Sequence, residues 1–139
     1  MKNIALIILM SIAANGTSAE LPDVSGMWVG SYSVGGSVVE CTMVIEQSRK
    51  IVKARMIEVQ TFGEEPSVGL TADVVGVINE SGIYLVKTYD GSGGQVHSVA
   101  YELQLSPDRQ VMNGTWSLGE GGSGASKFSR YRASVANDF

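Results

Sequence analysis

Residues 38–59 read VVECTMVIEQSRKIVKARMIEV, and this stretch decides between a β-hairpin and a helix. Apolar and polar residues alternate in two runs that are separated by the polar residues 47–49. A helix is the alternative, because several apolar residues also fall near helical spacing and the middle of the stretch is rich in helix formers. Both runs are rich in β-branched residues, which favour strands. The stretch therefore predicts a hairpin, whose inward face carries Val39, Cys41, Met43 and Ile45.

The same alternation recurs along the chain between short turns that are rich in glycine and other turn-forming residues. We interpret eight runs as strands: 27–34, 38–46, 50–60, 68–78, 82–89, 97–105, 109–118 and 127–135. Every connection is too short for a parallel crossover, so sequential neighbours are expected to pair antiparallel. A meander of this length keeps two unpaired edges unless it closes on itself. The predicted fold is therefore all-β, an eight-stranded up-and-down antiparallel β-barrel.

The N-terminal segment has the layout of a cleaved secretory signal peptide. A basic second residue precedes an apolar run at 4–14, and small residues at 17–19 form a cleavage site. A membrane anchor is the alternative, but the apolar run is shorter than the about 20 residues that cross a bilayer. We predict a signal peptide at 1–19, a single barrel domain at 20–139 with no transmembrane segment, and a secreted or periplasmic location.

Composition and motifs exclude several classes of function. The 139-residue chain is 44% hydrophobic, which excludes a disordered protein, and its net charge of −4 argues against nucleic-acid binding. One cysteine and one histidine, Cys41 and His97, are too few for a zinc site, and we predict no metal and no cofactor. Cys41 is expected to be a buried small hydrophobe. Residues 119–124 match G-x-G-x-x-G, but no helix follows, so they are predicted to be a hairpin loop.

Two distant parts of the chain resemble a known group of barrels. Gly26-Met27-Trp28 opens the first run, and Arg130 and Arg132 lie in the last one. A G-x-W with an arginine on the closing strand resembles the lipocalins and the wider calycin group, and the chain length is nearer to avidin-type barrels. The resemblance implies a small secreted barrel in which the arginine covers the tryptophan at one end. Arg130 is preferred for this role, because Arg132 lies nearer the C-terminus.

A barrel of eight strands is just wide enough to be filled by side chains or to hold one small ligand. The candidate ligand-binding residues are aromatic or polar residues placed inside the barrel or at its mouth: Trp28, Tyr32, Glu58, His97, Tyr101, Trp116 and Arg130. The sequence of the strand at 50–60 is compatible with either of its two faces pointing into the lumen. In one, Glu58 faces the lumen and needs a partner such as Arg130. In the other, Lys53 and Arg55 face inward and must reach a mouth to stay solvated.

The sequence favours an exported binding module for a small, largely apolar ligand, with the glycine-rich residues 91–94 and 119–124 at the rim. The alternative is a protein-interaction module, such as a barrel-type protease inhibitor or an envelope assembly factor. That alternative predicts a filled interior and an N-terminal segment, 20–25, that reaches a protein partner. An enzyme is less favoured, because no serine lies in a nucleophile motif and His97 has no evident catalytic partner. The volume of the lumen discriminates between these functions.

Overall fold

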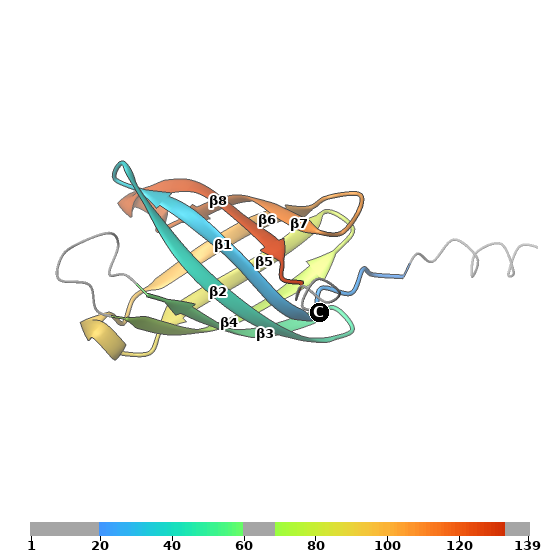
Figure 1. Ribbon diagram of the computed structural model, residues 1–139, viewed down its shortest axis with the longest axis horizontal. Helices are drawn as coiled ribbons and strands as arrows, with labels where there is room; N and C mark the ends of the chain where they lie inside the picture. Colours follow the sequence, from blue (N-terminus) through green and yellow to red (C-terminus); the bar gives the residue numbers. More distant parts are fainter. Residues whose placement is uncertain (1–19, 60–68, 133–139) are drawn as a thin grey trace, which may run out of the picture.

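The structure is a computed structural model that describes residues 20–59 and 69–132. These residues form a closed barrel in which each strand pairs antiparallel with the strands before and after it (Figure 1). The strands are β1 (Gly26–Val34), β2 (Ser37–Ser48), β3 (Ile51–Glu58), β4 (Leu70–Asn79), β5 (Gly82–Tyr89), β6 (Ser98–Leu105), β7 (Val111–Ser117) and β8 (Ser123–Arg130). Two short 3-10 turns, η1 (Ser92–Gly94) and η2 (Gly119–Gly121), lie in connections. The predicted all-β, eight-stranded up-and-down barrel is confirmed. The predicted signal peptide lies outside the described residues.

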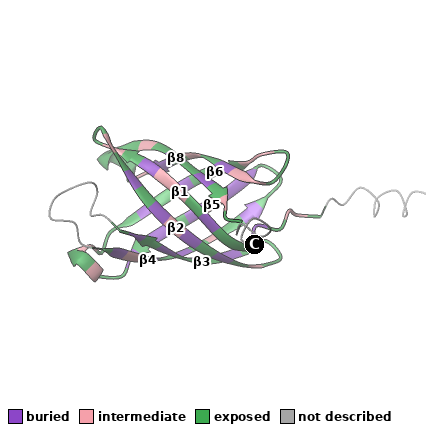
Figure 2. Ribbon diagram, viewed as in Figure 1, coloured by how far each residue is buried: buried purple, intermediate pink, exposed green. Residues whose placement is uncertain are grey.

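The hairpin predicted at residues 38–59 is confirmed, and the helical alternative is wrong. Strands β2 and β3 pair so that Cys41 lies opposite Glu58 and Ile45 lies opposite Ala54. The inward residues of β2 are buried as expected: Val39, Cys41, Met43 and Ile45. Burial alternates strictly along β3, with the even-numbered residues inside (Figure 2). The orientation that places Glu58 in the lumen is therefore the observed one.

The last strand begins earlier than the predicted range of 127–135. Strand β8 begins at Ser123, so two residues of the predicted loop at 119–124 belong to the sheet. Gly124 pairs with Trp116, and a Cβ atom on Gly124 would overlap the indole ring of Trp116. Glycine is normally weak in strands, but here it leaves room for a large neighbouring ring. The ends of three predicted runs, residues 60, 68 and 133–135, lie outside the described part of the chain.

Strands β1 and β8 close the barrel, and Gly30 lets them approach each other. Gly30 lies opposite Phe128, and a Cβ atom at position 30 would overlap the Lys127 carbonyl oxygen and the Phe128 ring. Glycine is therefore required at this position for steric reasons.

Gly30→Ala should lower the free energy of unfolding by about 1–3 kcal/mol, because the added methyl group overpacks the seam between β1 and β8. Gly69→Ala is the matched control, since a Cβ atom there would have its nearest contact at 3.6 Å, with the Glu58 carbonyl oxygen. We expect the control to change stability by no more than about 0.5 kcal/mol. Urea unfolding of both variants is the measurement, and equal midpoints would contradict the steric argument.

Candidate ligand-binding site

The meander divides the connections between two ends of the barrel (Figure 1). The connections β1–β2, β5–β6 and β7–β8 lie at one end, together with the end of β3 and the start of β4, and we call this the open end. The N-terminal segment 20–25 and the turns β2–β3, β4–β5 and β6–β7 lie at the other, which we call the closed end. The two ends differ in how they are covered, and this difference locates the candidate site.

An arginine covers a tryptophan at the closed end. The Trp28 side chain is fully buried, and its indole N–H donates to the Val24 carbonyl oxygen at 2.9 Å. The Arg130 guanidinium lies 4.4 Å from the centre of the Trp28 ring. It also donates to the carbonyl oxygens of Ser25 and Asp23, each at 3.0 Å. The predicted contact between Arg130 and Trp28 is confirmed, and the N-terminal segment is held across this end of the barrel.

The open end contains a cavity of about 500 Å³. This volume lies in the range of about 300–1,000 Å³ that is typical of small-molecule sites. Most of its wall is apolar or aromatic: Tyr32, Val34, Val99, Tyr101, Trp116 and Leu118. Polar groups reach it from Lys87, Tyr89 and His97. The lumen is therefore filled toward the closed end and hollow at the open end.

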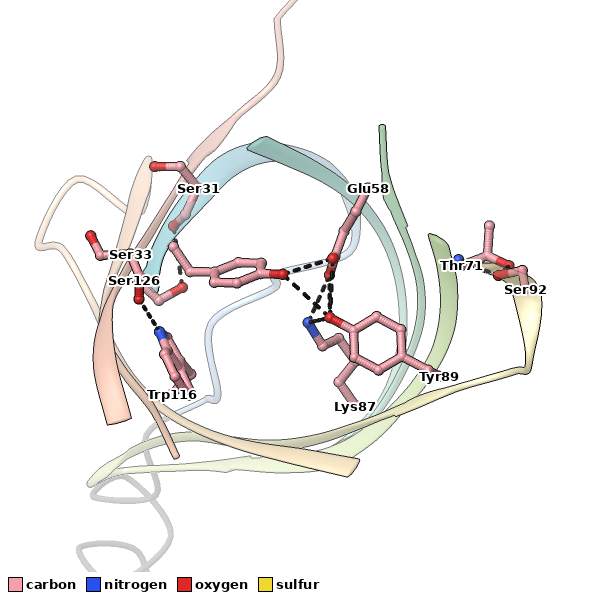
Figure 3. A network of polar contacts seen from close by, with 10 residues as sticks. Ser31, Ser33, Glu58, Thr71, Lys87, Tyr89, Ser92, Trp116 and Ser126 are labelled. Atoms are coloured by element: carbon pink, nitrogen blue, oxygen red, sulfur yellow. Dashed lines mark hydrogen bonds and ion pairs between the residues drawn. The ribbon is translucent and has the colours of Figure 1, made fainter. Parts of the chain in front are cut away.

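A buried ion pair lies at the floor of this cavity. The Lys87 ammonium of β5 contacts the Glu58 carboxylate of β3 at 2.7 Å, and each side chain is only 1% exposed. Figure 3 shows Glu58, Lys87 and Tyr89 pointing toward one another inside the ring of strands. Removing two charges from water is costly unless they are paired and hydrogen-bonded. The surrounding tyrosines supply those further hydrogen bonds.

Two tyrosine hydroxyls complete the hydrogen bonding of the ion pair. The Tyr32 hydroxyl donates to Glu58 Oε1 at 2.7 Å. The Tyr89 hydroxyl lies 3.0 and 2.9 Å from the two oxygens of Glu58 and accepts from Lys87 Nζ at 2.8 Å. The rings of Tyr32, Tyr89 and Tyr101 surround the ammonium, with centres 4.7, 4.5 and 5.4 Å from Nζ. The charges are thus balanced by protein groups alone.

Burial shifts the titration of the groups around the ion pair. It lowers the pKa of Lys87, while the neighbouring Glu58 carboxylate opposes that shift. Burial, together with hydrogen bonding and the Glu58 charge, raises the pKa of Tyr32 and Tyr89 well above the ordinary tyrosine value. Burial also raises the pKa of the Cys41 thiol to about 12, and Cys41 is buried in the core, as predicted. The tyrosine hydroxyls therefore remain neutral near pH 7.

The structure separates the predicted site residues into three groups. Those that line the cavity are Tyr32, His97, Tyr101 and Trp116. Glu58 lies in the lumen and reaches the site through its bonds to Lys87 and the tyrosines. Trp28 and Arg130 lie together at the closed end, away from the cavity. Both tryptophans are well buried, as expected.

The expected partner of Glu58 is wrong. Arg130 ends β8 at the closed end, whereas Glu58 ends β3 toward the open end, and Lys87 is the residue that pairs with Glu58. Lys87 and Tyr89 were not among the predicted site residues. The alternation along β5 could have identified both residues. One face of β5 carries Ile83, Leu85, Lys87 and Tyr89, and the first two are apolar, so this face is expected to point inward. A lysine on an apolar face marks an inward charge that needs a partner.

Residues of the rim are positioned by further contacts. The Trp116 indole N–H donates to the Ser33 carbonyl oxygen at 2.8 Å, which fixes the ring beside the β1–β2 turn. His97, one residue before β6, is exposed and its ring centre lies 4.8 Å from that of Tyr89. The β5–β6 connection is attached to β4, because the Thr71 backbone N–H donates to the Ser92 hydroxyl at 2.7 Å (Figure 3). These contacts shape the entrance of the cavity.

Residues 20–59 and 69–132 contain no cluster of three or more histidine, cysteine, aspartate or glutamate side chains that could hold a metal ion. In the same ranges, no helix has the length and apolarity needed to cross a membrane. Comparisons with protein-family models, with curated proteins and with solved structures found no match. The geometry of the cavity and its floor is thus the basis for assigning a function.

Proposed function

We propose that this protein is an exported binding module of the lipocalin or calycin type that holds a small, largely apolar ligand in the open-end cavity. The observation that carries the proposal is the cavity of about 500 Å³ with its apolar and aromatic wall. Apolar walls with a few convergent polar groups are the usual composition of small-ligand sites. The proposal of export is based on the signal peptide predicted at residues 1–19. The proposal of a lipocalin or calycin type is based on the contact between Trp28 and Arg130.

The floor of the cavity supports binding over catalysis. Both Glu58 oxygens already accept hydrogen bonds from protein donors, so the carboxylate is not available as a base for a substrate. His97 is exposed at the rim of the cavity, where its ring lies against Tyr89. The carboxylate and the ammonium of the floor are therefore engaged with each other and with tyrosine hydroxyls.

The alternative, a protein-interaction module, is supported less well. It requires a filled interior, and the open end is hollow. It also requires an N-terminal segment that is free to reach a partner. Val24 in that segment is fully buried, and Arg130 holds the carbonyl oxygens on either side of it. The segment thus serves as a cover for the closed end.

The test is saturable binding of N-phenyl-1-naphthylamine, a neutral apolar dye whose fluorescence rises in apolar surroundings. We expect Val99→Phe, which places a larger ring in the cavity wall, to weaken binding at least about tenfold, since tenfold corresponds to about 1.4 kcal/mol. Val34→Phe at the same cavity is a second blocking variant. Val75→Phe is the matched control, because Val75 is 54% exposed on the outside of the barrel. Dye binding that is absent, or equally strong in all variants, would contradict the proposal.

A further inference from the structure

One polar group in the wall of the cavity has no hydrogen-bond partner among the described residues. Tyr101 of β6 lines the cavity and is 1% exposed. Among the described residues, its hydroxyl is the buried side-chain polar atom that has no hydrogen-bond partner. Burial raises the pKa of Tyr101 well above the ordinary value, so the hydroxyl stays neutral and able to donate. Buried hydroxyls are nearly always hydrogen-bonded, and an exception at a cavity wall calls for a physical reason.

The neighbouring ion pair has donor capacity left, while both oxygens of its carboxylate are already hydrogen-bonded. The Glu58 oxygens accept from Tyr32, Tyr89 and Lys87. Lys87 uses two of the three N–H groups of its ammonium, toward Glu58 and Tyr89. The unpaired Tyr101 hydroxyl belongs to a ring whose centre is 5.4 Å from Lys87 Nζ. An acceptor on a ligand would therefore meet two unused donors, the Tyr101 hydroxyl and the third N–H group of Lys87.

The same contacts define the charge that the floor can accept. Glu58 already balances Lys87, at a distance of 2.7 Å and with both side chains buried. A bound carboxylate would add a second negative charge beside the buried Glu58 side chain, and this is unfavourable. A neutral acceptor adds a hydrogen bond without changing the charge balance.

We infer that the ligand is uncharged and consists of an apolar body with one hydrogen-bond acceptor, such as a ketone carbonyl, that binds the Tyr101 hydroxyl beside Lys87. This inference rests on the proposed function and adds to it the chemical class of the ligand. The apolar body lies against the wall formed by Val34, Val99 and Trp116. The acceptor supplies the hydrogen bond that the protein leaves unmade.

The experiment compares three probes that have the same number of non-hydrogen atoms: 2-acetylnaphthalene, 2-naphthoate and 2-isopropylnaphthalene. Each is titrated at pH 7 as a competitor of bound N-phenyl-1-naphthylamine. We expect the ketone to bind about fivefold to tenfold more tightly than the hydrocarbon, the range of one net hydrogen bond, and the carboxylate to bind most weakly. In Tyr101→Phe, the advantage of the ketone over the hydrocarbon should disappear, while the hydrocarbon binds as before.

A structural role of Tyr101 would instead change the binding of all three probes together. Tyr101→Phe removes only an unpaired hydroxyl, so its melting temperature should be no lower than that of the wild type. Tyr131→Phe is the matched control, because Tyr131 is exposed beyond the end of β8 and should leave every affinity unchanged. Tightest binding by the carboxylate, or a ketone advantage that persists in Tyr101→Phe, would overturn the inference and leave the proposed function standing. Failure of the dye to bind would overturn both.

Discussion

Glu58→Gln should lower the free energy of unfolding by about 3–5 kcal/mol at pH 7. The variant leaves the Lys87 ammonium buried, at 1% exposure, without a counter-charge. Urea unfolding is the measurement. Glu40→Gln is the matched control, because Glu40 lies on the exposed face of β2 and should change stability by no more than about 0.5 kcal/mol.

The loss in Glu58→Gln should depend on pH in a defined direction. Burial lowers the pKa of Lys87 in the folded protein, and in the variant Glu58 no longer opposes that shift. A lysine whose folded-state pKa is below its unfolded value of about 10.4 destabilises the fold where it is protonated in both states. The deficit relative to the wild type should therefore shrink as the pH rises from neutral toward about 10. A deficit that grows over this range would contradict the assignment.

The double variant Glu58→Gln/Lys87→Met separates the charge effect from packing. It removes both charges and keeps an apolar side chain of similar length at position 87. Replacing a whole buried ion pair is often close to neutral, whereas removing one partner is not. We expect the double variant to recover at least half of the stability lost in Glu58→Gln. A double variant as unstable as Glu58→Gln would show that shape, and not charge, makes the pair important.

Arg130→Ala should lower the free energy of unfolding by about 2–4 kcal/mol, because it removes a cation–π contact and at least two hydrogen bonds together. The guanidinium stacks on Trp28 at 4.4 Å and holds the carbonyl oxygens of Asp23 and Ser25. In a Trp116→Phe background, Trp28 is the only tryptophan, and its emission should move to longer wavelength when its cover is lost. Urea unfolding and the emission maximum are the two measurements.

Two further substitutions test the geometry of this contact. Arg130→Lys should recover only part of the loss, since an ammonium neither stacks on the ring nor donates as a planar fork. Arg132→Ala should have a small effect, because Arg132 is exposed beyond β8 and its guanidinium donates to the Gln110 side chain. An unchanged midpoint and an unchanged emission maximum in Arg130→Ala would refute the role of Arg130 as the cover of Trp28.

Much of the candidate site can be predicted from the alternation of side chains along each strand, once the inward face of that strand is known. Tyr101 and Trp116 could be placed in the lumen from their own strands, and both line the cavity. The direction of the Glu58 side chain could not be predicted, because β3 carries charged residues on both faces. The alternation within this strand does not show which of the two faces is the inward one. Lys87 is recognisable by the same rule, as the charged residue that shares a face with Ile83 and Leu85.

The sequence by itself determined the strands, their order and the inward faces of most of them, because side-chain alternation and short connections are local properties. The resemblance of Gly26-Met27-Trp28 and Arg130 to the lipocalin pattern implied the Trp28–Arg130 contact, and closure of the barrel places these two residues opposite each other. Only the tertiary structure decided that Lys87 is the partner of Glu58 and that the open end stays hollow. Those two residues lie on strands that are not neighbours, β3 and β5. Contacts across a lumen depend on the stagger and closure of all the strands, which no single stretch of sequence encodes.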